Sequence, residues 1–145
     1  MDVVASVEAP VPPQRLWPVV SDLSSYPRWV GIVHRAGASA DGSWDVELRG
    51  RVGPFARSKR LRMERTTADE PRLAVFERRE LDGRRHAAWR LRAEVVAQGS
   101  GSLLTMTLHY GGSMFGAGVL ERLLGEQIES SRQRLLDVLA GSSGA

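Results

Sequence analysis

The chain has 145 residues, of which 42% are hydrophobic and 26% charged, and its formal net charge is +3. This length is typical of one domain, and the composition argues against disorder of the whole chain. Because the sequence contains no cysteine, disulfides, thiolate nucleophiles and cysteine-based metal sites are excluded. We therefore expect a single folded domain over residues 1–140, followed by a flexible tail at 141–145.

The hydropathy pattern indicates whether the protein enters a membrane or is secreted. No apolar run approaches the roughly 20 residues that a membrane-spanning helix needs. The N-terminus lacks the basic segment and following apolar stretch of a signal peptide. The sequence therefore predicts a cytoplasmic protein without stable membrane insertion, as a monomer or homodimer.

Charge is distributed unevenly along the chain. Residues 49–92 hold fourteen Lys/Arg against six Asp/Glu, whereas the remainder holds six against eleven. A basic middle can face nucleic acid or an anionic membrane, or it can be the solvated outer face of a sheet. Nucleic-acid binding favours basic residues interleaved with exposed aromatic side chains, whereas the tryptophans here share the strand parity of the apolar residues. We therefore expect no nucleic-acid partner.

The first thirty residues predict one strand and two short helical segments. A β-branched run at Val3–Glu8 is typical of a strand. A proline pair at 12–13 suits the first turn of a helix, so a short helix follows. Residues 22–30 predict a second short helix or turn, with Ser24 or Ser25 as its N-cap.

Alternation of apolar and charged residues then predicts six further strands. Asp41-Gly42 and Asp82-Gly83 are hairpin-turn dipeptides, and hairpins imply an antiparallel sheet. The orientation of one strand stays open, because Val75 and Phe76 are adjacent and both apolar. The predicted strands are residues 32–36, 44–49, 55–67, 73–81, 87–95 and 104–110.

From about Ser113 the hydrophobic period becomes helical and continues for roughly 25 residues. Leu120, Leu124, Leu135 and Leu139 belong to one apolar stripe. A sheet with one apolar face needs a cover, and this amphipathic helix is the element large enough to provide it. The sequence therefore predicts an α+β fold.

This order of elements resembles the START-like, or SRPBCC, superfamily, in its polyketide cyclase/dehydrase and lipid transport branch. The resemblance rests on the opening strand with the segment Pro13–Asp22, on the sequence Tyr26–Val30, on the hairpins ending at Leu104–Tyr110, and on the terminal helix. It implies a helix-grip fold, in which a curved antiparallel sheet of about seven strands wraps a long C-terminal helix. It also implies a cavity between helix and sheet that admits an apolar or amphipathic ligand.

Ligand-binding candidates follow from strand alternation together with the helix stripe. Aromatic, sulfur-containing and aliphatic side chains of the inward parity are expected to line the cavity, although simple core packing explains any one of them equally well. A buried phenol also seeks a hydrogen-bond partner, which a ligand can supply. The candidates are Trp44, Leu61, Met63, Trp89, Leu91, Met106, Leu108, Tyr110, Leu120 and Leu124.

Two cations share the parity of the predicted lining. Arg57 and Lys59 alternate in register with Leu61 and Met63, so a regular strand directs them toward the cavity or its rim. There they can hold a carboxylate, phosphate or enolate. Alternatively, a bulge at residues 53–54 sends both side chains into water.

Catalytic and metal chemistry have weaker support in the sequence. Tyr110, Glu77 and Arg79 are the acid/base candidates, and Glu77 faces the cavity only if Val75 does. The three histidines lie far apart, without metal-ligand spacing, so we expect no metal and no cofactor. The glycines at 111–116 lack the lysine of a phosphate-binding loop.

Three functions remain open at this stage. The first is a carrier or sensor that binds a small hydrophobic molecule, such as a lipid, quinone or polyketide, in the cavity. The second is an enzyme, a polyketide cyclase/aromatase or hydrolase that uses the same cavity. The third is a protein-interaction or regulatory module that uses the basic sheet face or the helix.

Overall fold

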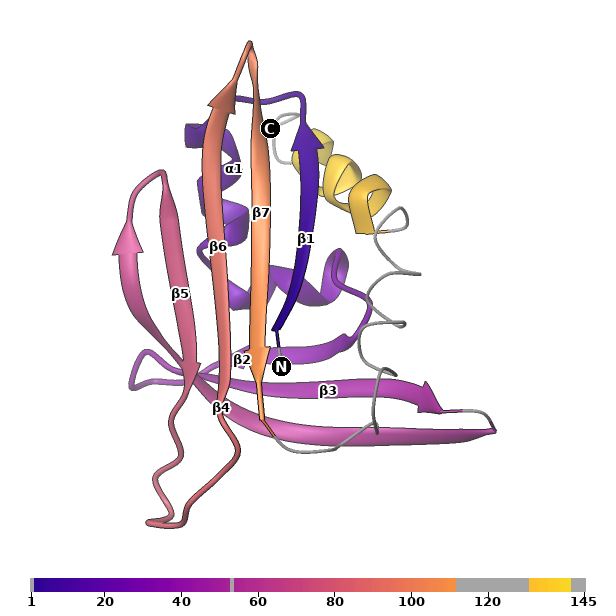
Figure 1. Ribbon diagram of the computed structural model, residues 1–145, viewed down its shortest axis with the longest axis vertical. Coiled ribbons are helices and arrows are strands. Elements are labelled where there is room, and N and C mark those ends of the chain that lie inside the picture. Colours follow the sequence, from indigo (N-terminus) through magenta and orange to yellow (C-terminus); the bar gives the residue numbers. More distant parts are fainter. Residues whose placement is uncertain (1, 53, 112–130, 142–145) are drawn as a thin grey trace.

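Seven antiparallel strands form one sheet in the computed structural model, which describes residues 2–52, 54–111 and 131–141. The strand order is β1-β7-β6-β5-β4-β3-β2, and every neighbouring pair is antiparallel (Figure 1). A helix covers residues 131–141. The other elements are β1 (Asp2–Ala9), α1 (Pro13–Val20), η1 (Leu23–Arg28), β2 (Val33–Ala38), β3 (Trp44–Val52), β4 (Phe55–Asp69), β5 (Leu73–Arg78), β6 (Trp89–Gln98) and β7 (Gly101–Tyr110).

The sheet is curled into a half-barrel. In Figure 1, β1, β7 and β6 run upright, whereas β2, β3 and one part of β4 run across below them. β4 joins both parts, because Met63 is opposite Trp44 of β3 on one side and Arg78 of β5 on the other. A register shift between Arg65 and Thr67 adds a bulge to β4, and bulges bend a strand.

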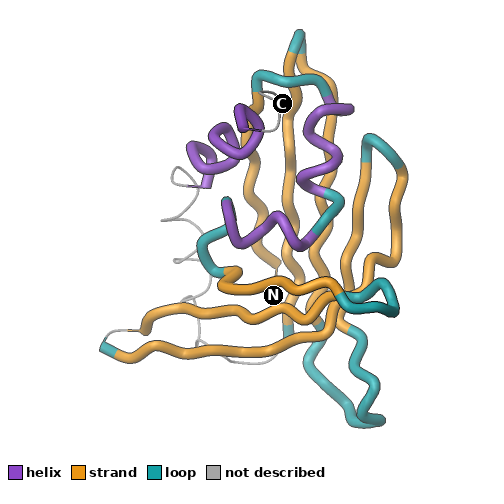
Figure 2. Tube along the Cα trace, turned by 180° about the vertical axis from the view of Figure 1, so that it is seen from behind, coloured by secondary structure: helices purple, strands orange, loops and turns teal. Residues whose placement is uncertain are grey.

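The helices lie together on the concave side of this sheet (Figure 2). The predicted α+β helix-grip fold is therefore confirmed. Leu135 and Leu139 of the terminal helix are buried, as the apolar stripe predicts. Leu120 and Leu124 lie outside the described residues, as do residues 142–145 of the predicted tail.

The junction between α1 and η1 is fixed by side chains that bind free backbone groups. Carbonyl groups at the end of a helix lack partners within the helix. Tyr26 Oη donates to the Val20 carbonyl at 2.7 Å, and Ser25 Oγ donates to the Val19 carbonyl at 2.6 Å. The N-cap of η1 is Asp22, whose carboxylate accepts from the Ser24 backbone N–H at 2.9 Å. The prediction of a serine cap was therefore wrong.

Aromatic rings fill the core between η1 and the sheet. Phe76 is fully buried, with its ring centroid 5.6 Å from that of Trp44 and 6.1 Å from that of Tyr26. This burial decides the orientation of β5, because successive side chains of a strand point to opposite faces. Phe76 points inward, and Val75 and Glu77 therefore belong to the outer face.

One turn and one loop occur where Asp41-Gly42 and Asp82-Gly83 predicted hairpin turns. Gly42 has a φ of +87° in the β2–β3 turn, and Gly83 has a φ of +73°. The chain around Gly83 is not a tight hairpin, however, because β5 ends at Arg78 and residues 79–88 form a loop. No helix within the described residues is long and apolar enough to cross a membrane.

Candidate ligand cavity

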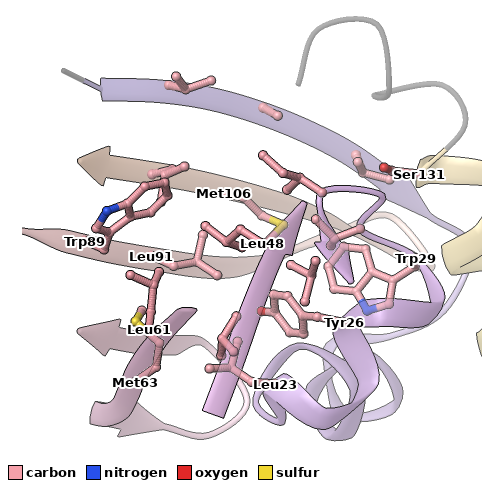
Figure 3. A pocket seen from close by; sticks show the side chains of 18 residues that line it. Leu23, Tyr26, Trp29, Leu48, Leu61, Met63, Trp89, Leu91, Met106 and Ser131 are labelled. Carbon is pink, nitrogen blue, oxygen red and sulfur yellow. The ribbon is translucent and has the colours of Figure 1, made fainter. Parts of the chain in front are cut away.

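A cavity of about 140 Å³ lies between the concave face of the sheet and the helical segments. Figure 3 shows the 18 side chains that line it. All of them are aliphatic, aromatic or methionine side chains except that of Ser131, at the start of the described part of the terminal helix. The cavity matches in size an engineered apolar cavity of about 150 Å³ that accommodates benzene.

Six of the ten candidate ligand-binding residues line this cavity. They come from β4, β6 and β7, and each has the inward parity that alternation predicts. Their role in binding remains a prediction, because their position shows only that they face the space. The six are Leu61, Met63, Trp89, Leu91, Met106 and Leu108.

Two other candidates are buried but do not line the cavity. Trp44 packs in the aromatic core, and its indole Nε1 donates to Ser24 Oγ at 3.0 Å. Tyr110 is buried beside Trp89, with ring centroids 5.5 Å apart. Each is directly opposite a lining residue in the sheet, Trp44 opposite Met63 and Tyr110 opposite Trp89. Leu120 and Leu124 lie outside the described residues.

The remaining lining comes from elements that the list of candidates omitted. β1 contributes Val3, Ala5 and Val7, which alternate with more exposed neighbours. β3 contributes Val46 and Leu48, which share the parity of Trp44. The segment 23–33 contributes six side chains, and no strand or helix period predicts which residues of such an irregular segment face inward.

Polar atoms near the cavity are largely used by the protein itself. The Tyr26 hydroxyl is bound to the Val20 carbonyl, and burial raises the pKa of this phenol well above its ordinary range. Trp29 Nε1 donates to Ser25 Oγ at 3.4 Å.

Among the buried side-chain polar atoms of the described residues, Trp89 Nε1 alone lacks a hydrogen-bond partner. In Figure 3 this nitrogen lies on the side of the ring turned away from Leu91. The lining therefore offers a ligand mainly apolar contact.

Arg57 and Lys59 belong to the same face of β4 as the lining residues Leu61 and Met63, but neither of them lines the cavity. Lys59 is opposite Leu48 in the β3–β4 register, and Arg57 is opposite Gly50. Residues directly opposite in neighbouring strands project from the same face, and Leu48 lines the cavity. Lys59 is half-buried and Arg57 is exposed. Neither forms a salt bridge with another described residue.

The acid/base candidates Glu77 and Arg79 lie away from the cavity. Glu77 is opposite Glu64 on β4 and Arg90 on β6, in the row of outward-facing side chains. Arg79 is exposed, and its guanidinium lies 3.9 Å from the Glu77 carboxylate. Neither residue lines the cavity. Within the described residues, no cluster of three or more histidine, aspartate or glutamate side chains is placed to hold a metal ion.

The outer face carries the charge ladders that alternation predicts. Arg62 binds the carboxylates of Asp41 and Glu64, and Arg92 binds Glu94 at 2.9 Å. Hydrogen bonds from Ser43 and Arg62 hold the pKa of Asp41 well below its usual range. Exposed pairs of this kind contribute about 0–1 kcal/mol each, and their main effect is a hydrated outer face.

The apolar cavity in a helix-grip fold agrees with the comparison against protein families. Residues 1–142 match the family described as polyketide cyclase/dehydrase and lipid transport. The chain belongs to this family. No curated protein sequence matches the chain.

Solved structures share the fold at low sequence identity. A protein of Thermus thermophilus superposes with a TM-score of 0.69 at 18% identity, covering 99% of both chains. A START superfamily protein from Mycobacterium smegmatis gives 0.68 at 17% identity, covering 97% of both chains. The Zhui aromatase/cyclase from Streptomyces sp. R1128 gives 0.55 at 13% identity, covering 99% of this chain and 93% of its own. These likenesses support the fold and leave the ligand undetermined.

Proposed function

We propose that the protein is a carrier or sensor that binds one small hydrophobic or amphipathic molecule, of lipid, quinone or polyketide type, in this cavity. The observation that carries the proposal is the lining itself, in which Ser131 is the one side chain among the described residues that is neither apolar nor aromatic. Apolar pockets with few polar groups are typical of small-molecule sites. The family's description, which includes lipid transport, points the same way.

An enzymatic use of the cavity has less support. Cyclisation of a reactive polyketide needs shape, exclusion of water and one or two acid/base groups. The lining residues within 2–52, 54–111 and 131–141 include no aspartate, glutamate, histidine, lysine or arginine. The phenol of Tyr26, which does line the cavity, is committed to the Val20 carbonyl. The described lining thus forms an apolar space of defined shape, but it provides no free acid or base.

Native mass spectrometry of the purified protein tests the proposal, followed by denaturing extraction and identification of whatever is bound. A copurified lipid, quinone or polyketide near one molecule per chain is the expected result. If the mass is that of the bare chain, the protein is then titrated with 1-octanol as a neutral apolar probe. Trp29 and Trp89 line the cavity, so their fluorescence reports entry of the probe. A bare mass together with no response to octanol would contradict the proposal.

A further inference from the structure

We infer that the molecule bound in the cavity is an anionic amphiphile, whose carboxylate or phosphate is held at the cavity margin by Lys59 and Arg57. This inference rests on the proposed function and adds to it the chemical class of the ligand. Its basis is the position of two cations on the face of β4 that lines an otherwise apolar space.

Register pairing places Lys59 beside the residues that line the cavity, although Lys59 itself is not one of them. Val33, Leu48 and Lys59 form one row across β2, β3 and β4, since Val33 is opposite Leu48 and Leu48 is opposite Lys59. Val33 and Leu48 both line the cavity. The next inward residue of β4, Leu61, lines it as well. Lys59 therefore continues a row of lining side chains and ends it with an ammonium group.

Arg57 extends the same line of side chains by one step. It is two residues from Lys59, so both side chains leave the same face of β4. Its partner across β3 is Gly50, which has no side chain to occupy the concave face beside it. As whole residues, Arg57 is exposed and Lys59 is half-buried, so the pair extends from open solvent toward the apolar lining.

Neither cation is paired with another side chain among the residues that the structure describes. A carboxylate or phosphate between them would gain charge-assisted hydrogen bonds, and these are stronger where the site is partly shielded from water. The guanidinium is also suited to bidentate contact with either oxyanion.

Edge protection is the competing explanation for these charges. Pairing of β4 with β5 begins only at Met63, so the stretch around Lys59 borders β3 alone among the described strands. Cations on such an edge discourage strand addition from another chain. That explanation applies equally to Arg60, which is on the same edge but faces outward opposite Glu47. Edge protection therefore gives the inward and outward cations the same role, whereas ligand binding requires the inward cations only. Substitutions of inward and outward cations should accordingly have different effects on anion binding.

The test compares three probes with the same tail, 1-octanol, octanoate and octyl phosphate, by isothermal titration calorimetry. The variant R57Q/K59Q removes the two inward cations. The matched control R60Q/R90Q removes two outward cations from β4 and β6, with the same change of net charge. Size-exclusion chromatography and thermal unfolding check that each variant stays monodisperse and folded.

For the wild type and R60Q/R90Q, we expect one or both anions to bind at least about tenfold more tightly than octanol, the range for a charge-assisted contact. In R57Q/K59Q this preference should disappear, while octanol binding stays unchanged. The anion that loses more affinity identifies the head group as carboxylate or phosphate. For the wild type, raising NaCl from 50 to 500 mM should weaken anion binding and leave octanol binding unaltered.

Two results overturn the inference while leaving the proposed function in place. One is equal binding of octanol and both anions to the wild type. The other is an anion preference that survives in R57Q/K59Q or is lost equally in R60Q/R90Q. Failure of all three probes to bind the wild type would instead contradict the proposed function, and this inference with it.

Discussion

Asp41 in the β2–β3 turn is held by more hydrogen bonds than a surface carboxylate usually has. It accepts from Ser43 Oγ at 2.5 Å, from the Ser43 backbone N–H at 3.0 Å, and from the Arg62 guanidinium at 2.9 Å. These bonds favour the ionised form, which is why the pKa of Asp41 lies well below its ordinary value. The turn is therefore linked to β4 through a charged contact that depends on pH.

Replacement of Asp41 by asparagine should lower the free energy of unfolding at pH 7, because the variant loses the charged contact with Arg62. A carboxylate with a lowered pKa in the folded state contributes stability above its unfolded pKa of about 4, and that contribution is lost as the pH falls below this value. Urea unfolding at pH 7, 5, 4 and 2.5 should thus show a constant difference between wild type and variant at the two higher pH values. The difference should narrow below pH 4. A difference that stays constant down to pH 2.5 would contradict this role.

Phe76 is the side chain on which the aromatic core depends most directly. It is fully buried and contacts the rings of Tyr26 and Trp44. Phe76→Ala should destabilise the protein by about 3–5 kcal/mol, through lost transfer energy and the cavity that remains. Val75→Ala, a change on the outer face of the same strand, is the control and should have an effect of about 1 kcal/mol or less. Similar losses in the two variants, measured by denaturant unfolding, would refute the inward orientation of Phe76.

At the scale of elements, the junction between β1 and β7 depends on a residue without a side chain. A Cβ built on Gly101 would lie 2.4 Å from the Ala9 carbonyl oxygen, a backbone atom that cannot move aside alone. Gly101→Ala should therefore force the two strands apart and destabilise the protein by about 1–3 kcal/mol. Gly37→Ala in β2 meets nothing within 4 Å and should change stability by no more than about 0.5 kcal/mol. Equal thermal midpoints for the two variants would argue against close contact at Gly101.

Strands were the part of the fold that the sequence predicted best. A half-buried strand alternates strictly, so Leu61, Met63, Leu91 and Met106 could be assigned to the inner face from their charged or polar neighbours alone. β5 could not be oriented, because Val75 and Phe76 are both apolar and only tertiary packing distinguishes them. The contribution of Tyr26 and Trp29 to the cavity was also not predictable. Their orientation follows from hydrogen bonds to α1 and Ser25, which have no sequence period.

At the scale of the whole molecule, the cavity results from curvature. The sheet changes direction within β4, which pairs with β3 on one side and with β5 on the other. The two parts of the sheet therefore face the helices at different angles. The side chains at this corner are aliphatic or aromatic and leave about 140 Å³ unfilled. An unfilled apolar space costs stability in the free protein. A ligand that occupies it would recover contacts, so binding should raise the thermal midpoint.

The measurement that tests the central claim most directly is ligand binding by a variant whose cavity is filled from within. Ala5 of β1 lines the cavity opposite Met106, whereas its neighbour Val4 is 61% exposed on the outer face. Ala5→Phe places a ring in the space, and Val4→Phe is the matched control on the same strand. By calorimetry, octanol should bind the wild type and Val4→Phe alike, and Ala5→Phe at least about tenfold more weakly, as expected for the loss of a buried apolar site. Equal binding to a folded Ala5→Phe variant would place the ligand elsewhere and contradict the assignment of this cavity as the binding site.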